Sequence, residues 1–129
     1  MTGENNTVLE SLEVILKKLV SSNPKITMAT ISTVEGLPIL SVLPRKANET
    51  IISAMVATLL SISERTVVEM EIGKFKQLFV KGINGFLLVF DAEVAVVAVS
   101  TNKDAQLGLV IFECERAALE ISKILSSEN

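Results

Sequence analysis

Residues 94–99 read Val-Ala-Val-Val-Ala-Val, an apolar run without a single polar residue. A strand with one face in solvent alternates apolar and polar residues, whereas a strand covered on both faces is apolar throughout. The run therefore predicts a strand that is buried on both faces. Its sheet then needs helices on both sides.

Four other segments have strand-like composition and extend this sheet. They cover residues 26–33, 37–43, 74–80 and 86–90. Short turns separate neighbouring segments, and the pair Glu35-Gly36 supplies a glycine that can adopt a positive φ. Because strands joined by such short turns lie antiparallel, the sequence predicts a five-stranded antiparallel sheet.

Three segments have the apolar spacing of amphipathic helices. The first begins at Thr7, which can form a capping box with Glu10, and it ends before Pro24. The second runs from residue 48 or 49 to residue 71, and Gly73 closes it. The third carries an apolar stripe, formed by Leu107, Ile111, Cys114, Ala118, Ile121 and Leu125.

The order αββαβββα predicts one α+β domain over residues 1–129, with its core over about residues 7–125. The long second helix is expected to cover one face of the sheet, and the other two helices the opposite face. This is a three-layer α/β/α arrangement. A chain of 129 residues also fits a single domain at roughly 150 residues per domain.

The composition excludes several classes of function. Hydrophobic residues make up 49% of the chain, yet it has no His, Tyr or Trp and one cysteine, Cys114. The commonest general base and metal ligand is therefore absent, and one thiol forms neither an internal disulfide nor a zinc cluster. A net charge of −3 disfavours nucleic acid as a partner. We predict no catalytic residue, no metal and no cofactor, with Cys114 a buried small hydrophobe.

The long second helix is the most informative segment. Its apolar residues fill an arc of about 180°, wider than the ~100° stripe that contact with a sheet requires. The remaining face is small and polar, with Ser53, Ala57 and Ser61 on one ridge, and no charge lies between Glu49 and Glu64. One interpretation is that loops of the same domain cover this helix. The interpretation we favour is that the wide arc meets a second subunit and the small face meets a partner.

The strand predicted over 74–80 is apolar on both faces, with Phe75 and Phe79 on one and Leu78 and Val80 on the other. Such an edge strand is a liability unless it pairs, so we predict two-fold pairing of this strand with its copy. Three lysines lie in and beside it, Lys74, Lys76 and Lys81. We interpret them as protection of a sheet edge rather than as a phosphate-binding patch.

Three features together resemble the roadblock (dynein light chain) family. They are the hairpin over residues 34–39, the long uncharged second helix, and Asp-Ala-Gln-Leu-Gly-Leu at 104–109 leading into the last helix at 116–121. Gln106 stands where the family usually has Asn, and Glu35-Gly36 where it usually has Asp-Gly. The resemblance covers about residues 9–125 and is closest to the prokaryotic GTPase-regulating members.

The resemblance implies a profilin- or longin-like fold and a homodimer, or a heterodimer with a paralogue, joined through the second helix and third strand. Paired second helices form a platform for small Ras-like GTPases in this family. The implied dimer contacts are Ser53, Ala57, Leu60, Ser61, Glu64, Lys74, Phe75, Lys76, Gln77, Leu78, Phe79 and Val80. The implied partner-binding residues are Thr50, Ala54, Thr58, Ser61 and Arg65.

Three functions therefore stay open. The first is a non-catalytic dimeric scaffold that binds a small GTPase and modulates its localisation or GTP hydrolysis. The second is a light-chain-type subunit of a motor or membrane-associated complex, and the third is a sensor module for a small apolar ligand. No secretory signal or membrane insertion is predicted, so we expect a cytoplasmic protein.

Two residues have competing interpretations. Arg65 could act as an arginine finger, or it could form an i, i+4 ion pair with Glu69. Gly108 is expected to permit close packing of the last helix on the sheet, because no phosphate-binding loop motif surrounds it.

Overall fold

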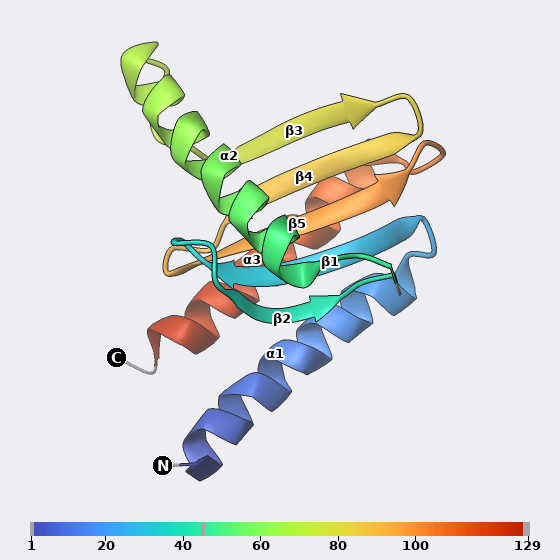
Figure 1. The fold of residues 1–129 in the computed structure, drawn as a ribbon, viewed down its shortest axis with the longest axis vertical. Helices are drawn as coiled ribbons and strands as arrows, with labels where there is room; N and C mark the ends of the chain where they lie inside the picture. Colours follow the sequence, from blue (N-terminus) through green and yellow to red (C-terminus); the bar gives the residue numbers. More distant parts are fainter. Residues whose placement is uncertain (1, 45, 128–129) are drawn as a thin grey trace.

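The central layer is one antiparallel sheet with strand order β2-β1-β5-β4-β3 (Figure 1). The computed structural model describes residues 2–44 and 46–127, with side chains from Thr7 onward. The strands are β1 (Ile26–Thr33), β2 (Pro38–Val42), β3 (Gln77–Gly82), β4 (Gly85–Asp91) and β5 (Ala95–Asn102). The strand predicted from residues 94–99 is thus β5, and it lies at the centre of the sheet.

Three helices cover the two faces of this sheet, as predicted. They are α1 (Thr2–Ser22), α2 (Glu49–Glu69) and α3 (Leu107–Ser126), and the element order is the predicted αββαβββα. The helices α1 and α3 pack against each other on one face, whereas α2 lies alone on the other (Figure 1).

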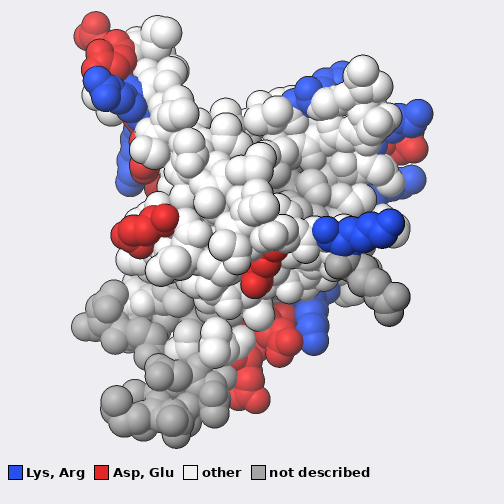
Figure 2. Space-filling view, viewed as in Figure 1, with Lys and Arg blue, Asp and Glu red and all other residues white. Residues whose placement is uncertain are grey.

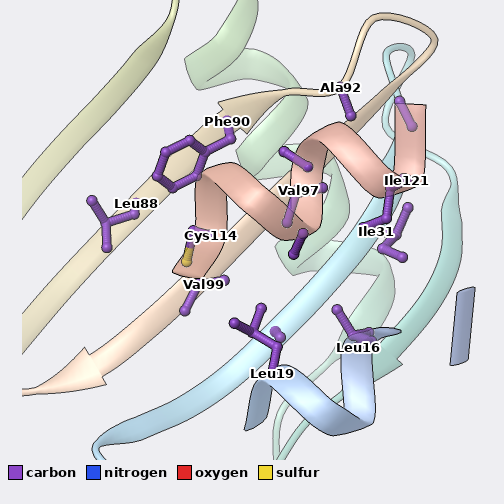
Figure 3. Packing of buried hydrophobic residues seen from close by; sticks show 14 of the residues in the cluster. Leu16, Leu19, Ile31, Leu88, Phe90, Ala92, Val97, Val99, Cys114 and Ile121 are labelled. Carbon is purple, nitrogen blue, oxygen red and sulfur yellow. The ribbon is translucent and has the colours of Figure 1, made fainter. Parts of the chain in front are cut away.

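The larger core lies between the sheet and α1 with α3. Val97 and Val99 of β5 point into it and meet Leu16 of α1 and Cys114 of α3 (Figure 3). The smaller core lies on the α2 side, where Val96 and Ala98 of the same strand take part. Both faces of β5 are therefore buried, which is the physical reason for its unbroken apolar sequence.

The predicted start of α1 is wrong. The helix begins at Thr2, so Thr7 lies inside it and cannot be an N-cap residue. A capping box requires non-helical backbone at its first residue, and here helical backbone continues upstream of Thr7.

The end of α2 also differs from the prediction. The C-cap residue is Met70, and Glu71 takes the left-handed conformation with φ 56°. The amides of Glu71 and Ile72 donate to the carbonyl oxygens of Val68 and Val67, which closes the last turn as a Schellman motif. Gly73, with φ 102°, only turns the chain further. Consequently β3 begins at Gln77, three residues later than predicted.

Gly108 does not serve close packing. It is exposed in the first turn of α3, and a Cβ added there would meet no described atom within 4 Å. The close approach that we expected at Gly108 occurs instead at Gly85, at the start of β4.

Candidate interface for protein partners

Helix α2 crosses the sheet from the β2 side towards β3, and its last turns project beyond the edge of the sheet (Figure 1). The residues near this end of α2 are exposed to solvent, apart from Val67, which is half-buried. Val68, Met70 and Ile72 each expose about two-thirds of their surface. Exposed apolar residues that the sheet does not cover indicate a surface that can bind another chain.

The outward face of α2 is apolar and uncharged over most of its length. Ile51, Met55 and Ile62 lie on it, and the exposed fractions of Met55 and Ile62 are 59% and 60%. Figure 2, which looks at this side of the molecule, shows a broad uncharged surface with charged groups at its margins. A solvated helix normally carries charged residues on its outer face, so this face is suited to contact with protein.

The opposite side of α2 faces the sheet and is made partly of small residues. Ser53, Val56, Ala57 and Leu60 are its buried residues. The expectation that Ser53 and Ala57 form an outward ridge is therefore wrong. Among the predicted dimer contacts, Ser53, Ala57 and Leu60, together with Phe75, have almost no surface left for a second copy.

The physical reason is the close approach of the β1–β2 hairpin to α2. Gly36, with φ 99°, is buried under the helix, and a Cβ there would lie 3.2 Å from the Ala57 Cβ and 3.3 Å from the Ala54 Cα. Small residues on this ridge thus admit the chain's own hairpin. Sequence alone cannot separate this use of small residues from close approach of a second helix.

The predicted partner-binding residues Thr50, Ala54, Thr58, Ser61 and Arg65 are all exposed. Ala54, Thr58 and Ser61 line a shallow groove between α2 and the β1–β2 turn. Arg65 lies further along the helix. The predicted ion pair between Arg65 and Glu69 is not formed. Among the described side chains, the ion pair found joins Lys17 and Glu13. Glu64 and Ser61, predicted at the dimer contact, are also exposed.

A layer of buried hydroxyl groups lies beneath the N-terminal half of α2. Thr30 and Ser32 of β1, Ser41 of β2 and Ser53 of α2 have buried hydroxyl oxygens, and no hydrogen-bond partner for them is found among the described residues. Thr30 and Ser41 are direct cross-strand neighbours. A buried hydroxyl without a partner costs about 1–3 kcal/mol, so each of these groups lowers the stability of the fold.

Replacement of Ser53 by alanine is therefore expected to raise the free energy of unfolding by up to about 1 kcal/mol. The change removes an unsatisfied hydroxyl and leaves the helix contact in place. Ser61→Ala is the matched control, since it changes helix propensity by the same amount at an exposed position of the same helix. Urea unfolding of both variants gives the comparison. A loss of more than about 1 kcal/mol in Ser53→Ala would show that this hydroxyl is bonded.

The outer edge of β3 has no strand beside it in the described sheet. Leu78 points to the α2 side, where it joins the smaller core, while Phe79 stacks on Phe86 with ring centroids 5.3 Å apart. The predicted grouping of Phe75 with Phe79 is wrong, because Phe75 is buried on the α2 side. It precedes the first residue of β3, where strand alternation does not apply.

The remaining residues predicted at this edge are accessible. Lys74, Lys76 and Val80 are exposed and Gln77 is half-buried. Lys81 places its ammonium group 5.8 Å from the centroid of the Phe86 ring, a cation–π contact. An open strand edge beside an overhanging apolar helix is a surface that a second chain can extend.

Cys114 lies inside the larger core (Figure 3). Burial, with smaller contributions from the nearby Glu113 and Glu115 carboxylates, raises the pKa of its thiol from 9.0 to about 12. The thiol is uncharged at neutral pH and buried, which makes it a poor nucleophile. This agrees with its predicted place as a small hydrophobe.

At about pH 8, the Cys114 thiol of the native protein is accordingly expected to resist a maleimide reagent. The same thiol should react once the protein is unfolded in urea. This pH lies below the ordinary pKa of a cysteine thiol, so the difference reports burial. Since the folded-state pKa is raised, stabilisation by the protonated thiol is present below pH 9 and is lost as the pH rises towards 12. Mass spectrometry counts the adduct. Rapid labelling of the native protein would show that α3 opens readily from the core.

A metal site and a membrane-spanning helix are two other features that these residues could form. No three His, Cys, Asp or Glu side chains come together as metal ligands within the described part of the chain. Helix α2 is long and apolar enough, by length and composition, to cross a membrane, and 22% of that apolar window is buried. Because its inner side packs on the sheet, we interpret the apolar outer side as a protein-binding face.

The sequence matches the model of the Roadblock/LC7 domain over residues 13–101. The chain belongs to the Roadblock/LC7 family. The matched residues include α2 and β3, the elements that carry the exposed helix face and the open edge. They stop before α3, so the predicted signature at 104–109 lies outside the match.

Solved structures share this roadblock fold. An MglB "with tetrameric arrangement" is 18% identical, with a TM-score of 0.85 over 93% of this chain and 91% of its own. A gliding protein MglB from Thermus thermophilus is 17% identical, with a TM-score of 0.82 over 93% and 92% of the two chains. Profilin IA of Acanthamoeba castellanii is 10% identical, with a TM-score of 0.62 over 85% and 95%. A comparison with curated proteins finds no match.

Proposed function

We propose that this roadblock protein is a non-catalytic dimeric regulator that binds a small Ras-like GTPase. It modulates the localisation of the GTPase or its GTP hydrolysis, and it acts in the cytoplasm. The observation that carries this proposal is the outward face of α2, which is apolar, free of charge between Glu49 and Glu64, and not covered by the rest of the protein.

The dimer is supported by the overhang of α2. Its last turns extend past β3 (Figure 1), so a second copy placed beside β3 would meet this overhang with its own α2. Pairing of β3 with its copy would satisfy the open strand edge and join two sheets into one. Two α2 helices then lie side by side and present one continuous surface.

The partner surface follows from the part of α2 that such a dimer leaves free. Ala54, Thr58 and Ser61 line the shallow groove beside the β1–β2 turn, where small side chains allow a partner to approach the backbone. The chain offers neither an imidazole nor a clustered set of carboxylates among the residues that line this groove. We therefore propose that it acts on hydrolysis by positioning groups that belong to the GTPase. The match to the Roadblock/LC7 model and the similarity to MglB structures, one of them described as a gliding protein, support a role of the roadblock type.

The test uses the purified full-length chain and the small Ras-like GTPases encoded by its source genome. We expect one of them, loaded with a non-hydrolysable GTP analogue, to bind with a dissociation constant in the micromolar range or lower. Thr58→Glu places a charge in the groove and should weaken binding by at least about tenfold, or about 1.4 kcal/mol. Ser21→Glu, at an exposed position of α1, is the matched control.

The outcomes of this test distinguish a regulator of GTP hydrolysis, a scaffold and a membrane-facing protein. Binding with a changed rate of GTP hydrolysis supports a regulator, and binding without such a change supports a scaffold. Arg65→Ala tests the arginine finger, because loss of stimulation with unchanged binding would assign that role to Arg65. Absence of binding to every such GTPase, together with flotation of the protein on lipid vesicles, would overturn the proposal in favour of a membrane-facing α2.

A further inference from the structure

The turn between β3 and β4 carries an isoleucine that nothing covers. Ile83 exposes 93% of its surface, the largest fraction among the large apolar residues of the described chain. Turns normally hold polar residues or glycine, and this turn has Asn84 beside it and glycine on both sides. A bulky apolar side chain at such a tip is costly in water unless it is buried against a partner.

A groove of about 270 Å³ lies at the opposite end of β3. Leu119, which is 56% exposed, provides apolar surface above the nearly buried Phe90 and Ala118. Lys74, Lys76 and Gln77 form the side next to the open edge, and three carboxylate residues, Asp91, Glu93 and Glu115, also line the groove. Ile83 cannot reach this groove within its own chain, because the six residues of β3 separate them by roughly 20 Å.

The register in which the two β3 strands pair decides where the β3–β4 turn of the second copy lies. The two α2 helices can lie side by side only if both are on the same face of the joined sheet. Directly opposed residues of antiparallel strands point to the same face, so the two-fold axis must lie between a residue and its own copy in the second strand, directly opposite it. Over the length of β3, Phe79 then lies opposite Phe79, or Val80 opposite Val80.

The register centred on Val80 brings the turn of one copy to the groove of the other. In that register Ile83 lies opposite Gln77 of the second copy, which lines the groove. With Phe79 at the centre, Ile83 would instead lie opposite Phe75, which precedes β3 and is buried on the α2 side. Gln77 pairs with Phe90, whose ring lies in the core between the sheet and α3, so position 77 faces the α3 side. Alternate positions 79, 81 and 83 continue along that same side.

We propose that Ile83 of each copy binds in the groove between β3 and α3 of the other copy. Two such contacts per dimer fix the register of the β3 pair and hold the ends of the joined strands. The proposal rests on the dimer of the proposed function. It adds a contact that neither the α2 face nor the open edge requires.

Cross-linking tests the contact directly. In a Cys114→Ala background, Gln77→Cys and Ile83→Cys are made in separate chains, and the two proteins are mixed and oxidised. We expect a covalent heterodimer from the mixture, and no covalent dimer from either protein alone. In the register centred on Val80, residue 77 lies directly opposite residue 83 of the second copy and on the same face, whereas residue 77 is several positions away from its own copy.

Affinity gives an independent reading. Ile83→Ser removes two buried isoleucines per dimer and is expected to raise the dissociation constant of the dimer by roughly a hundredfold. Leu37→Ser, in the exposed β1–β2 turn, is the matched control and should leave it unchanged. A dimer with wild-type affinity in Ile83→Ser and no 77–83 cross-link would overturn this contact alone. A wild-type chain that stays monomeric would instead overturn the proposed function.

Discussion

Aspartate at both Met55 and Ile62 is expected to convert the protein into a folded monomer. Both side chains are more than half exposed on the outer face of α2, so their replacement leaves the cores intact. In the proposed dimer four carboxylates would be buried close to one another without partners. Burial of unpaired charge is strongly unfavourable, and the dissociation constant should rise at least about a thousandfold, or about 4 kcal/mol.

The control for this variant is Val14→Asp. Val14 is 65% exposed on α1, on the other side of the sheet, and it has a similar size and apolar character. Light scattering on both variants reports their mass, and circular dichroism reports their fold. A Met55→Asp, Ile62→Asp protein that keeps the mass of the wild type would mean that α2 takes no part in assembly.

Replacement of Gly85 by alanine is expected to abolish or severely reduce folding. A Cβ at this position would collide with the carbonyl oxygen of Thr101 and would lie 3.1 Å from its carbonyl carbon and 3.4 Å from the Asn102 Cα. All three atoms belong to the backbone at the end of β5, the central strand, which pairs with β4 there through Asn102 and Gly85, so relief of the clash would disrupt this pairing. We expect a loss of at least about 3 kcal/mol, a large share of the stability of a domain of this size.

Gly82→Ala separates this clash from a general effect of glycine in the turn. Gly82 pairs with Gly85 in the same hairpin, but a Cβ there would approach its nearest atom, the Gly85 carbonyl oxygen, to 3.6 Å, an ordinary contact. Thermal unfolding of the two variants is the measurement. Equal stability of Gly82→Ala and Gly85→Ala would show that β4 and β5 adjust more freely than their register implies.

These two glycines show what sequence could and could not predict. Both stand beside a turn between strand-like runs, which predicts the hairpin but not which glycine meets another backbone. That depends on the β4–β5 register, a tertiary property. The strands, their order along the chain and the burial of both faces of β5 followed from residue type and spacing, because those patterns report local conformation and burial.

The candidate surface was predicted in part. The excess of apolar residues on α2 and the apolar edge strand were visible in the sequence, and the structure leaves Ile51, Met55 and Ile62 uncovered. The sequence could not predict that Ser53 and Ala57 lie on the inner side of α2, because these small residues allow the close approach of Gly36 from a hairpin earlier in the chain. Phe75 was misplaced because strand alternation was extended over residues that precede β3.

The central claim is that two copies join through the outer face of α2 and the open edge of β3. Its most direct test is the mass of the wild-type protein by light scattering after gel filtration, at micromolar concentration. We predict a mass close to twice the 13.9 kDa of one chain. A mass of one chain, unchanged on raising the concentration, would contradict the account.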